Sequence, residues 1–241
     1  MSRTLLITRQ PADCTELQAL VADCGIVLEP FPVLRLEDVD DDPGWDTAIA
    51  AAAGAGPAWL VMASPRAPER FVRLCRDRGA EQLLDLPLAV VGDGTASAAA
   101  GTGLGPTVVG PGTGLGLAEI LVERLADTPA AVIFACGHHR RPELPDALAA
   151  AGHRVLPVVV YRMRATPVDE LPTVASDLDG VIVTSPRAAA LYLQAVGGRP
   201  LPCRHWALGP TTRDAARALG VECLTPDNPS LESLAEELCR T

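Results

Sequence analysis

The sequence contains no lysine, so its 20 basic side chains are all arginines. They are outnumbered by 30 acidic residues, which leaves a formal net charge of −10. This acidic balance argues against general binding to nucleic acid or to an anionic membrane surface. It still permits binding of an anionic small molecule, because arginines can be concentrated locally.

Aromatic residues are also scarce, at 3% of the chain, whereas 48% of the residues are hydrophobic. This composition excludes intrinsic disorder and predicts cores built from aliphatic side chains and alanine. The two uncharged stretches, 47–65 and 94–118, are interrupted by glycine and proline, so neither predicts a membrane span. The first residues lack the apolar segment of a signal peptide, which favours a cytoplasmic location.

Cysteine occurs 7 times, but the sequence lacks any Cys-x-x-Cys pair. An odd number of scattered cysteines argues against a disulfide framework or a zinc ribbon, so we expect reduced thiols. The adjacent His138 and His139 have no further ligand at metal-binding spacing. We interpret residues 138–141 as a solvated or carboxylate-facing basic loop, and the chain as one that needs no metal or cofactor.

Short β-rich runs alternate with helical periodicity along the chain. Leu5–Thr8 precedes a helix that carries Leu17 and Val21 and ends at Gly25. Further strands, each followed by a helix, are predicted at 59–62, 88–91, 132–134, 181–183 and 206–208. This alternation predicts parallel sheets with helices on both faces.

The chain also repeats itself. The segments 25–35, 64–67 and 92–95 recur in the same order as 152–162, 185–188 and 209–212, at offsets that differ by a few residues. The clearest repeat is Ser-Pro-Arg-Ala, which occurs at 64–67 and at 185–188. Two similar α/β halves predict a cleft between them, where a small ligand commonly binds.

Both Ser-Pro-Arg turns follow a predicted strand and precede a helix. Serine is a favoured N-cap and proline a favoured first helical residue, so capping alone explains both turns. Alternatively, the strand ends and helix N-termini offer amide donors to an anion. The same two interpretations, capping or ligand binding, are open for Thr95 and Thr212.

The glycine-rich segment 110–116 superficially resembles a dinucleotide-binding turn. Pro111 interrupts that turn, and the next strand ends without an acidic residue to bind a ribose, so we interpret the segment as a flexible loop. Tyr161 ends the apolar run 156–160 beside two arginines. Tyr161 either packs against neighbouring side chains there or takes part in a reaction.

Several short motifs, each weak alone, occur in a definite order. They are Ile7-Thr8-Arg9, Phe31-Pro32-Val33-Leu34, Ser64-Pro65-Arg66-Ala67, Val90-Val91-Gly92 with Thr95-Ala96, Phe134-Ala135-Cys136-Gly137 with Leu144-Pro145 and Leu148, Val160-Tyr161, Thr184-Ser185-Pro186 and Gly209-Pro210-Thr211-Thr212. Because its motifs occur in this order and at this spacing, the chain resembles the uroporphyrinogen-III synthase family over essentially its full length.

The resemblance implies two similar parallel-sheet α/β domains that exchange their first βα units and are joined by a two-segment linker. One domain is expected to hold residues 1–34 with 168–241, and the other residues 41–158. The linkers are then 35–40 and 159–167, which would act as a hinge.

The resemblance also implies an activity. The family are lyases that convert hydroxymethylbilane into uroporphyrinogen III, closing the macrocycle with inversion of ring D and loss of water. They use no metal or cofactor and serve the synthesis of haem, sirohaem and cobalamin.

Site residues follow from the same resemblance. Tyr161 matches the tyrosine that is the best candidate to protonate the leaving hydroxyl. Ser64, Thr95, Ser185 and Thr212 match positions that line the cleft and would bind the substrate carboxylates. Arg9 is a further candidate anchor, and Ala63 replaces a threonine that is common in the family.

Two alternatives remain at this point. One is a non-catalytic, synthase-like module that binds tetrapyrroles, which the lack of an added DNA-binding segment disfavours. The other is a two-lobed periplasmic ligand-binding protein, which the missing signal peptide and unpaired cysteines disfavour. We expect a cytoplasmic monomer that binds a small-molecule substrate and neither nucleic acid nor membrane.

Overall fold

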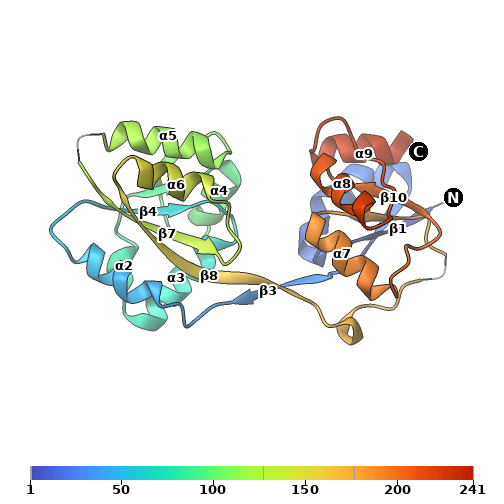
Figure 1. The fold of residues 1–241 in the computed structure, drawn as a ribbon, viewed down its shortest axis with the longest axis horizontal. Coiled ribbons are helices and arrows are strands. Elements are labelled where there is room, and N and C mark those ends of the chain that lie inside the picture. Colours follow the sequence, from blue (N-terminus) through green and yellow to red (C-terminus); the bar gives the residue numbers. More distant parts are fainter. Residues whose placement is uncertain (1, 127, 176, 241) are drawn as a thin grey trace. The chain divides into compact units, whose positions relative to one another are not determined.

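A computed structural model describes residues 2–126, 128–175 and 177–240. The chain forms two compact units. The terminal unit comprises Met1–Arg35 with Arg164–Thr241, and the central unit comprises Leu36–Met163. In each unit, helices pack on both faces of a predominantly parallel sheet, as the alternating sequence pattern predicts (Figure 1).

The terminal unit contains a four-stranded sheet in the order β10-β9-β1-β2, with every neighbouring pair parallel. Its strands are β1 (Arg3–Ile7), β2 (Ile26–Pro30), β9 (Gly180–Val183) and β10 (Arg204–Ala207). Its helices are η1 (Pro11–Cys14), α1 (Thr15–Val21), η2 (Ala22–Cys24), η4 (Val168–Glu170), α7 (Pro186–Ala195), α8 (Pro210–Ala218) and α9 (Leu231–Arg240). The helices α1 and α9 cover one face of the sheet, and α7 and α8 cover the other.

The central unit contains a six-stranded sheet in the order β3-β8-β7-β4-β5-β6, and the pairs from β8 to β6 are parallel. Its strands are β3 (Leu34–Asp38), β4 (Ala58–Met62), β5 (Leu88–Val90), β6 (Pro106–Val109), β7 (Ala131–Gly137) and β8 (Arg154–Ala165). Its helices are α2 (Gly44–Ala52), α3 (Ala67–Arg78), η3 (Glu81–Leu83), α4 (Asp93–Ala100), α5 (Gly114–Arg124) and α6 (Glu143–Ala150). The helices α2, α3 and α4 contribute to the core on one face, and α5 and α6 to the core on the other.

The predicted exchange of βα units is confirmed by the strand pairing. The N-terminal unit β1-α1-β2 pairs with β9, and β7-α6-β8 pairs with β4. The matched glycines Gly25 and Gly152 precede β2 and β8 with φ angles of 67° and 89°. Their lack of a side chain makes this left-handed turn accessible at the same point in both repeats.

The segments that the resemblance assigns to linkers are largely β-strand. Residues 35–38 belong to β3, and residues 159–165 extend β8. The two strands are neighbours in one sheet, and the division between the compact units falls after Arg35 and after Met163.

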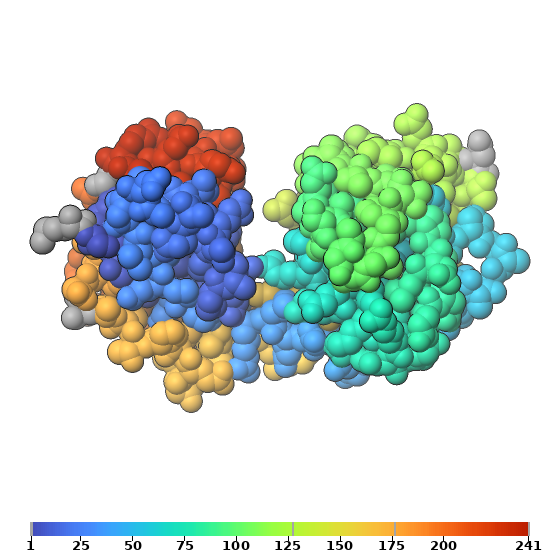
Figure 2. Space-filling model, turned by 180° about the vertical axis from the view of Figure 1, so that it is seen from behind, coloured from blue at the N-terminus to red at the C-terminus, as the bar shows by residue number. Residues whose placement is uncertain are grey.

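The expectation that all thiols are free is wrong for one pair. Cys24 and Cys239 form a disulfide, with their Cα atoms 5.6 Å apart, and the other cysteines are free. The N-terminal and C-terminal segments lie side by side on the surface of the terminal unit (Figure 2), because α1 and α9 share one hydrophobic core. Since this contact depends on tertiary packing, spacing along the sequence could not reveal it.

The two Ser-Pro-Arg turns differ in structure. Ser185 is the N-cap of α7 and accepts a hydrogen bond from the Ala188 N–H at 3.1 Å, as capping predicts. The helix α3 instead begins at Ala67, with Arg66 as its N-cap. The Ser64 hydroxyl accepts from the Arg66 N–H at 3.3 Å, before the helix begins. Helix capping therefore explains Ser185 but not Ser64.

A buried tyrosine–histidine pair lies in the terminal unit. The Tyr192 hydroxyl lies 2.8 Å from His205 Nε2, and His205 Nδ1 lies 3.0 Å from the Cys203 carbonyl oxygen. The carbonyl can only accept, so Nδ1 carries the proton and Nε2 accepts from the tyrosine. Burial lowers the pKa of His205 below its ordinary value and raises the pKa of Tyr192 to about 12. The neutral imidazole therefore makes a hydrogen bond with both the Tyr192 hydroxyl and the Cys203 carbonyl oxygen.

We expect the terminal unit to lose stability on mild acidification. His205 titrates at its ordinary pKa of 6.5 in the unfolded chain and at a lower pKa in the folded unit. Its contribution is therefore complete above that ordinary value and is lost as the pH falls through the folded pKa. Thermal unfolding between about pH 8 and about pH 5 measures this effect. The pH dependence of Tm should be weaker in His205→Gln and unchanged in the exposed control His138→Gln; equal slopes in all three proteins would contradict this explanation.

None of the helices in the described ranges has the length and hydrophobicity that crossing a bilayer requires.

Candidate functional site

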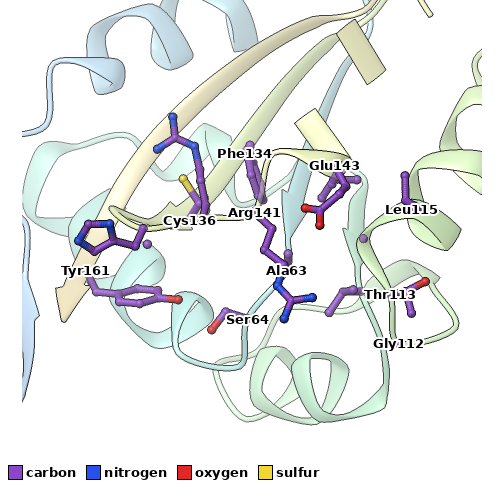
Figure 3. Close-up of a pocket in the computed structure, with 17 residues that line it drawn as sticks. Ala63, Ser64, Gly112, Thr113, Leu115, Phe134, Cys136, Arg141, Glu143 and Tyr161 are labelled. Atoms are coloured by element: carbon purple, nitrogen blue, oxygen red, sulfur yellow. The ribbon is translucent and has the colours of Figure 1, made fainter. Parts of the chain in front are cut away.

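A pocket of about 690 Å³ lies at the carboxyl ends of strands in the central unit (Figure 3). Parallel α/β sheets commonly bind ligands at this edge. Its lining comes from the turn after β4, the segment before α5, the end of β7, the loop before α6, and β8. The polar or charged side chains among its lining residues are Ser64, Thr113, Cys136, His139, Arg140, Arg141, Glu143 and Tyr161.

Tyr161 and Ser64, two of the candidate site residues, line this pocket. The phenol of Tyr161 extends from β8, and its hydroxyl points toward Ser64 (Figure 3). Ala63, the residue that departs from the family pattern, also lines the pocket and supplies no hydroxyl.

Only residues 110–113 of the segment 110–116 form a loop, so our interpretation is wrong for the remainder. The helix α5 begins at Gly114, and its N-cap Thr113 accepts a hydrogen bond from the Gly116 N–H at 3.2 Å. A β-carbon on Gly92 would lie 3.0 Å from Gly112 Cα, so the segment packs closely against the start of α4. The N-terminus of α5 therefore borders the pocket and contributes amide donors and a partial positive charge.

The basic loop after β7 contributes His139, Arg140 and Arg141 to the pocket lining. The side chain of Arg141 lies between Ser64 and Thr113 (Figure 3). Arginine pairs well with carboxylates because its guanidinium donates in a planar fork. The pocket thus combines positive charge with hydrogen-bond donors, which suits the carboxylate-facing interpretation of this loop.

Cys136 is the thiol in the pocket lining. Burial raises its pKa to about 11, although the nearby Arg140 acts in the opposite direction. A thiol with this pKa is almost entirely protonated at neutral pH and is a poor nucleophile. No cluster of three or more His, Cys, Asp or Glu side chains among the described residues could hold a metal ion.

Thr95 and Thr212 occupy matched positions, each the third residue of its helix, α4 in the central unit and α8 in the terminal unit. The N-caps of these helices are Gly92 and Gly209, without a side-chain cap, so the capping interpretation is wrong for both threonines. Thr95 is 2% exposed and Thr212 is 6% exposed. Within the part of the chain that the structure describes, neither hydroxyl makes a hydrogen bond. Neither oxygen is among the fully enclosed side-chain atoms without a partner in the described residues, so both hydroxyls remain accessible and are candidates to bind a ligand.

The other two candidates, Ser185 and Arg9, belong to the terminal unit. The Ser185 hydroxyl is engaged as the N-cap of α7. Arg9 Nη1 donates to the Asp13 carbonyl oxygen at 3.3 Å. The central pocket thus contains Tyr161 and Ser64, whereas Thr95 does not line it.

One polar contact between strand ends in the terminal unit is not predicted from the sequence. The Thr184 N–H donates to Thr8 Oγ1 at 3.1 Å, and the Thr184 hydroxyl donates to the Thr8 carbonyl oxygen at 3.2 Å. These bonds join the segments that follow β9 and β1. Both threonines stand in the motifs Ile7-Thr8-Arg9 and Thr184-Ser185-Pro186, which could have indicated the contact.

The fold and the pocket define a class: a protein of two parallel α/β units with a pocket suited to a polycarboxylate at the strand ends of one unit. A family model narrows this class. The chain belongs to the family described as Uroporphyrinogen-III synthase HemD, whose model matches residues 15–236. The family resemblance inferred from the sequence motifs is thereby confirmed.

Solved structures with a similar fold are also described as uroporphyrinogen-III synthases. The chain is similar to a mutant uroporphyrinogen III synthase from Thermus thermophilus, with 21% identity, 99% of this chain and 98% of that chain covered, and a TM-score of 0.59. It is also similar to a uroporphyrinogen-III synthetase from Helicobacter pylori, with 15% identity, 100% and 99% coverage, and a TM-score of 0.66. At these identities the similarity shows the fold. No curated protein sequence matches the chain significantly.

Proposed function

We propose that the protein is a uroporphyrinogen-III synthase, a cyclising hydro-lyase that converts hydroxymethylbilane into uroporphyrinogen III. The observation that carries this proposal is the family match across residues 15–236. Membership of this family implies an enzyme of tetrapyrrole synthesis. The positively charged pocket supports the proposal, because the substrate carries several acetate and propionate groups.

The reaction requires little covalent chemistry from the protein. The terminal hydroxyl of hydroxymethylbilane leaves as water, which generates an azafulvene. The substituted α-carbon of ring D attacks the exocyclic methylene carbon of the azafulvene and forms a spiro-pyrrolenine. The bond between that ring carbon and the methylene bridge to ring C then breaks, which leaves a second azafulvene on ring C. The free α-carbon of ring D attacks this second azafulvene and loses its proton, so the macrocycle closes with ring D inverted. The enzyme must assist departure of the hydroxyl and hold the chain so that direct closure to isomer I is slower.

Tyr161 is proposed as the proton donor to the leaving hydroxyl. A tyrosine phenol is protonated at neutral pH and can donate a proton. The position of Tyr161 in the pocket, with its hydroxyl directed toward Ser64, supports this role (Figure 3). The high pKa of Cys136 disfavours a covalent thiolate mechanism from the same pocket.

Five further residues are proposed to bind substrate carboxylates. They are Arg9, Ser64, Thr95, Ser185 and Thr212. The hydroxyls of Thr95 and Thr212 make no hydrogen bond within the described residues and are not fully enclosed, which supports their part in this role. The starts of α4 and α8 add backbone amides and a partial positive charge beside these threonines.

We also propose two domains, 1–34 with 168–241 and 41–158, joined by linkers at 35–40 and 159–167. The division into compact units after Arg35 and after Met163 supports these boundaries. We propose a cytoplasmic monomer that acts without a cofactor and without a nucleic-acid or membrane partner. The net charge of −10 supports the absence of anionic macromolecular partners. In the reducing cytoplasm we expect Cys24 and Cys239 to be two thiols rather than the disulfide that their positions in the structure allow.

Turnover distinguishes an enzyme from the non-catalytic binding module. Hydroxymethylbilane, generated freshly, is supplied at about a hundredfold molar excess over the purified protein, enough for many turnovers per molecule. We expect its consumption to exceed the spontaneous rate until the substrate is exhausted. Stoichiometric binding with consumption at the spontaneous rate would favour the binding module instead.

A further inference from the structure

Gly137 and Tyr161 are in unusually close contact. Gly137 is the last residue of β7, and Tyr161 lies opposite it in β8. A β-carbon at Gly137 would lie 2.7 Å from both Cε2 and Cζ of Tyr161 and 2.9 Å from its phenolic oxygen. Distances this short do not occur between a real β-carbon and a neighbouring atom, so any side chain at residue 137 must displace the phenol or the strand.

Gly137 is required because there is no room for a side chain, not because of its backbone conformation. Gly137 is absent from the glycines with positive φ, so an alanine could adopt its backbone conformation. The atoms nearest to its missing β-carbon all belong to the Tyr161 side chain. The effect of adding a methyl group would therefore act first on that tyrosine.

An irregularity in the strand pairing determines the direction of the tyrosine side chain. Cys136 pairs with Val159, but Gly137 pairs with Tyr161, so Val160 is an extra residue in β8. Val159 packs in the core on one face of the sheet and Val160 in the core on the other. Simple alternation would return Tyr161 to the face of Val159. Instead Tyr161 packs against the same core as Val160, because a bulge redirects the side chain that follows it.

The backbone holds this arrangement in place. The His138 N–H donates to the Tyr161 carbonyl oxygen at 2.9 Å, directly beyond the bulge. Val160 is fully buried, which anchors the extra residue in the core. Tyr161 therefore cannot slide along β7 without breaking this bond or withdrawing Val160 from the core.

We propose that Gly137 is a positioning residue for Tyr161. The absent side chain lets the bulge place the phenol against the backbone of β7, which holds the hydroxyl in the pocket. This proposal rests on the proton-donor role proposed above for Tyr161. It assigns a catalytic consequence to a glycine that has no side chain with which to act on the substrate.

The kinetic test compares Gly137→Ala with Gly105→Ala. A β-carbon at Gly105 meets no atom within 4 Å, and this residue also lacks a positive φ, so it is a matched control. We expect Gly137→Ala to lower kcat for isomer III formation by about 10- to 100-fold with KM within about twofold, because a proton donor displaced by about 1 Å loses most of its effect. Gly105→Ala should retain normal kinetics.

A double-mutant comparison of kcat distinguishes a positioning role of Gly137 from a general structural defect. In the Tyr161→Phe background the proton donor is already absent, so Gly137→Ala should cause little further loss of kcat. Equal losses from Gly137→Ala in both backgrounds would overturn the positioning role. So would normal kinetics of Gly137→Ala beside an impaired Tyr161→Phe.

A stability measurement tests the contact independently of activity. Gly137→Ala should lower Tm when Tyr161 is present and should not lower it in the Tyr161→Ala background, where the colliding ring is gone. The same decrease of Tm in both backgrounds would overturn the contact. Near-normal turnover by Tyr161→Phe, with the Tm coupling intact, would overturn the proton-donor role and with it the catalytic meaning of the contact, but not the contact itself.

Discussion

Replacing Tyr161 with phenylalanine is expected to lower kcat for isomer III formation by about 10²- to 10⁴-fold, the usual contribution of a general acid. The ring and its packing against the core remain, so the fold and KM should change little. The measurement is steady-state formation of isomer III at saturating hydroxymethylbilane. Tm should stay close to that of the unmodified protein.

Tyr192→Phe is the matched control, because it removes the hydroxyl of the chain's second tyrosine. That hydroxyl donates to His205 Nε2 and accepts from the Leu201 N–H, so its loss leaves two partners unpaired and should cost about 1–3 kcal/mol of stability. The folded variant should retain normal kcat. Near-normal kcat of Tyr161→Phe would contradict the general-acid role. Catalysis would then depend on holding the substrate in shape, since hydroxymethylbilane also loses its hydroxyl spontaneously.

The second large effect is expected at the matched threonines. Thr95→Val and Thr212→Val remove a hydroxyl and nearly conserve side-chain shape. Each should lower kcat/KM by about 10- to 100-fold, since a hydrogen bond to a charged group contributes about 1.5–3 kcal/mol. Stability should not fall, because neither hydroxyl makes a hydrogen bond within the described residues of the free protein. Kinetics and thermal unfolding of the same preparations measure both effects.

Thr107→Val serves as the control for these two variants, because Thr107 is an exposed residue of β6. It should change neither kcat/KM nor Tm appreciably. Loss of stability in Thr95→Val or Thr212→Val that parallels the loss of activity would point to a structural hydroxyl. That outcome would contradict their assignment to carboxylate binding.

Local sequence patterns predict most of the helices and strands and their order along the chain. Helical spacing in α1 and the glycine that follows it predicted a helix that ends at Gly25, and the structure has a left-handed glycine there. The exchange of βα units could not be derived in this way. The strands β1 and β4 are both apolar, and local pattern does not say which strand each will pair with. That expectation came from the family resemblance.

The disulfide and the glycine-rich segment show where local reasoning fails. Cys24 and Cys239 are 215 residues apart, and only packing of α9 on α1 brings them together. The glycines of segment 110–116 suggested flexibility, yet Thr113 caps a helix within that segment. Glycine content alone was therefore a poor guide to where the helix begins.

The candidate site was predictable only in part. Tyr161 and Ser64 were named from motifs and lie in the same pocket. The sequence indicates the basic loop 138–141 as a candidate to face carboxylates, but it does not connect this loop with that pocket. The bulge that redirects Tyr161 was not predictable, because the motif Phe134-Ala135-Cys136-Gly137 does not reveal the register of β8.

The isomer composition of the product tests the central claim most directly. The purified protein is dialysed against a chelator and supplied with hydroxymethylbilane; the products are then oxidised, and uroporphyrin isomers I and III are separated. We expect isomer III to predominate without added metal or cofactor, whereas a buffer control yields isomer I. Isomer I alone, from protein shown to be folded by circular dichroism, would contradict the synthase assignment.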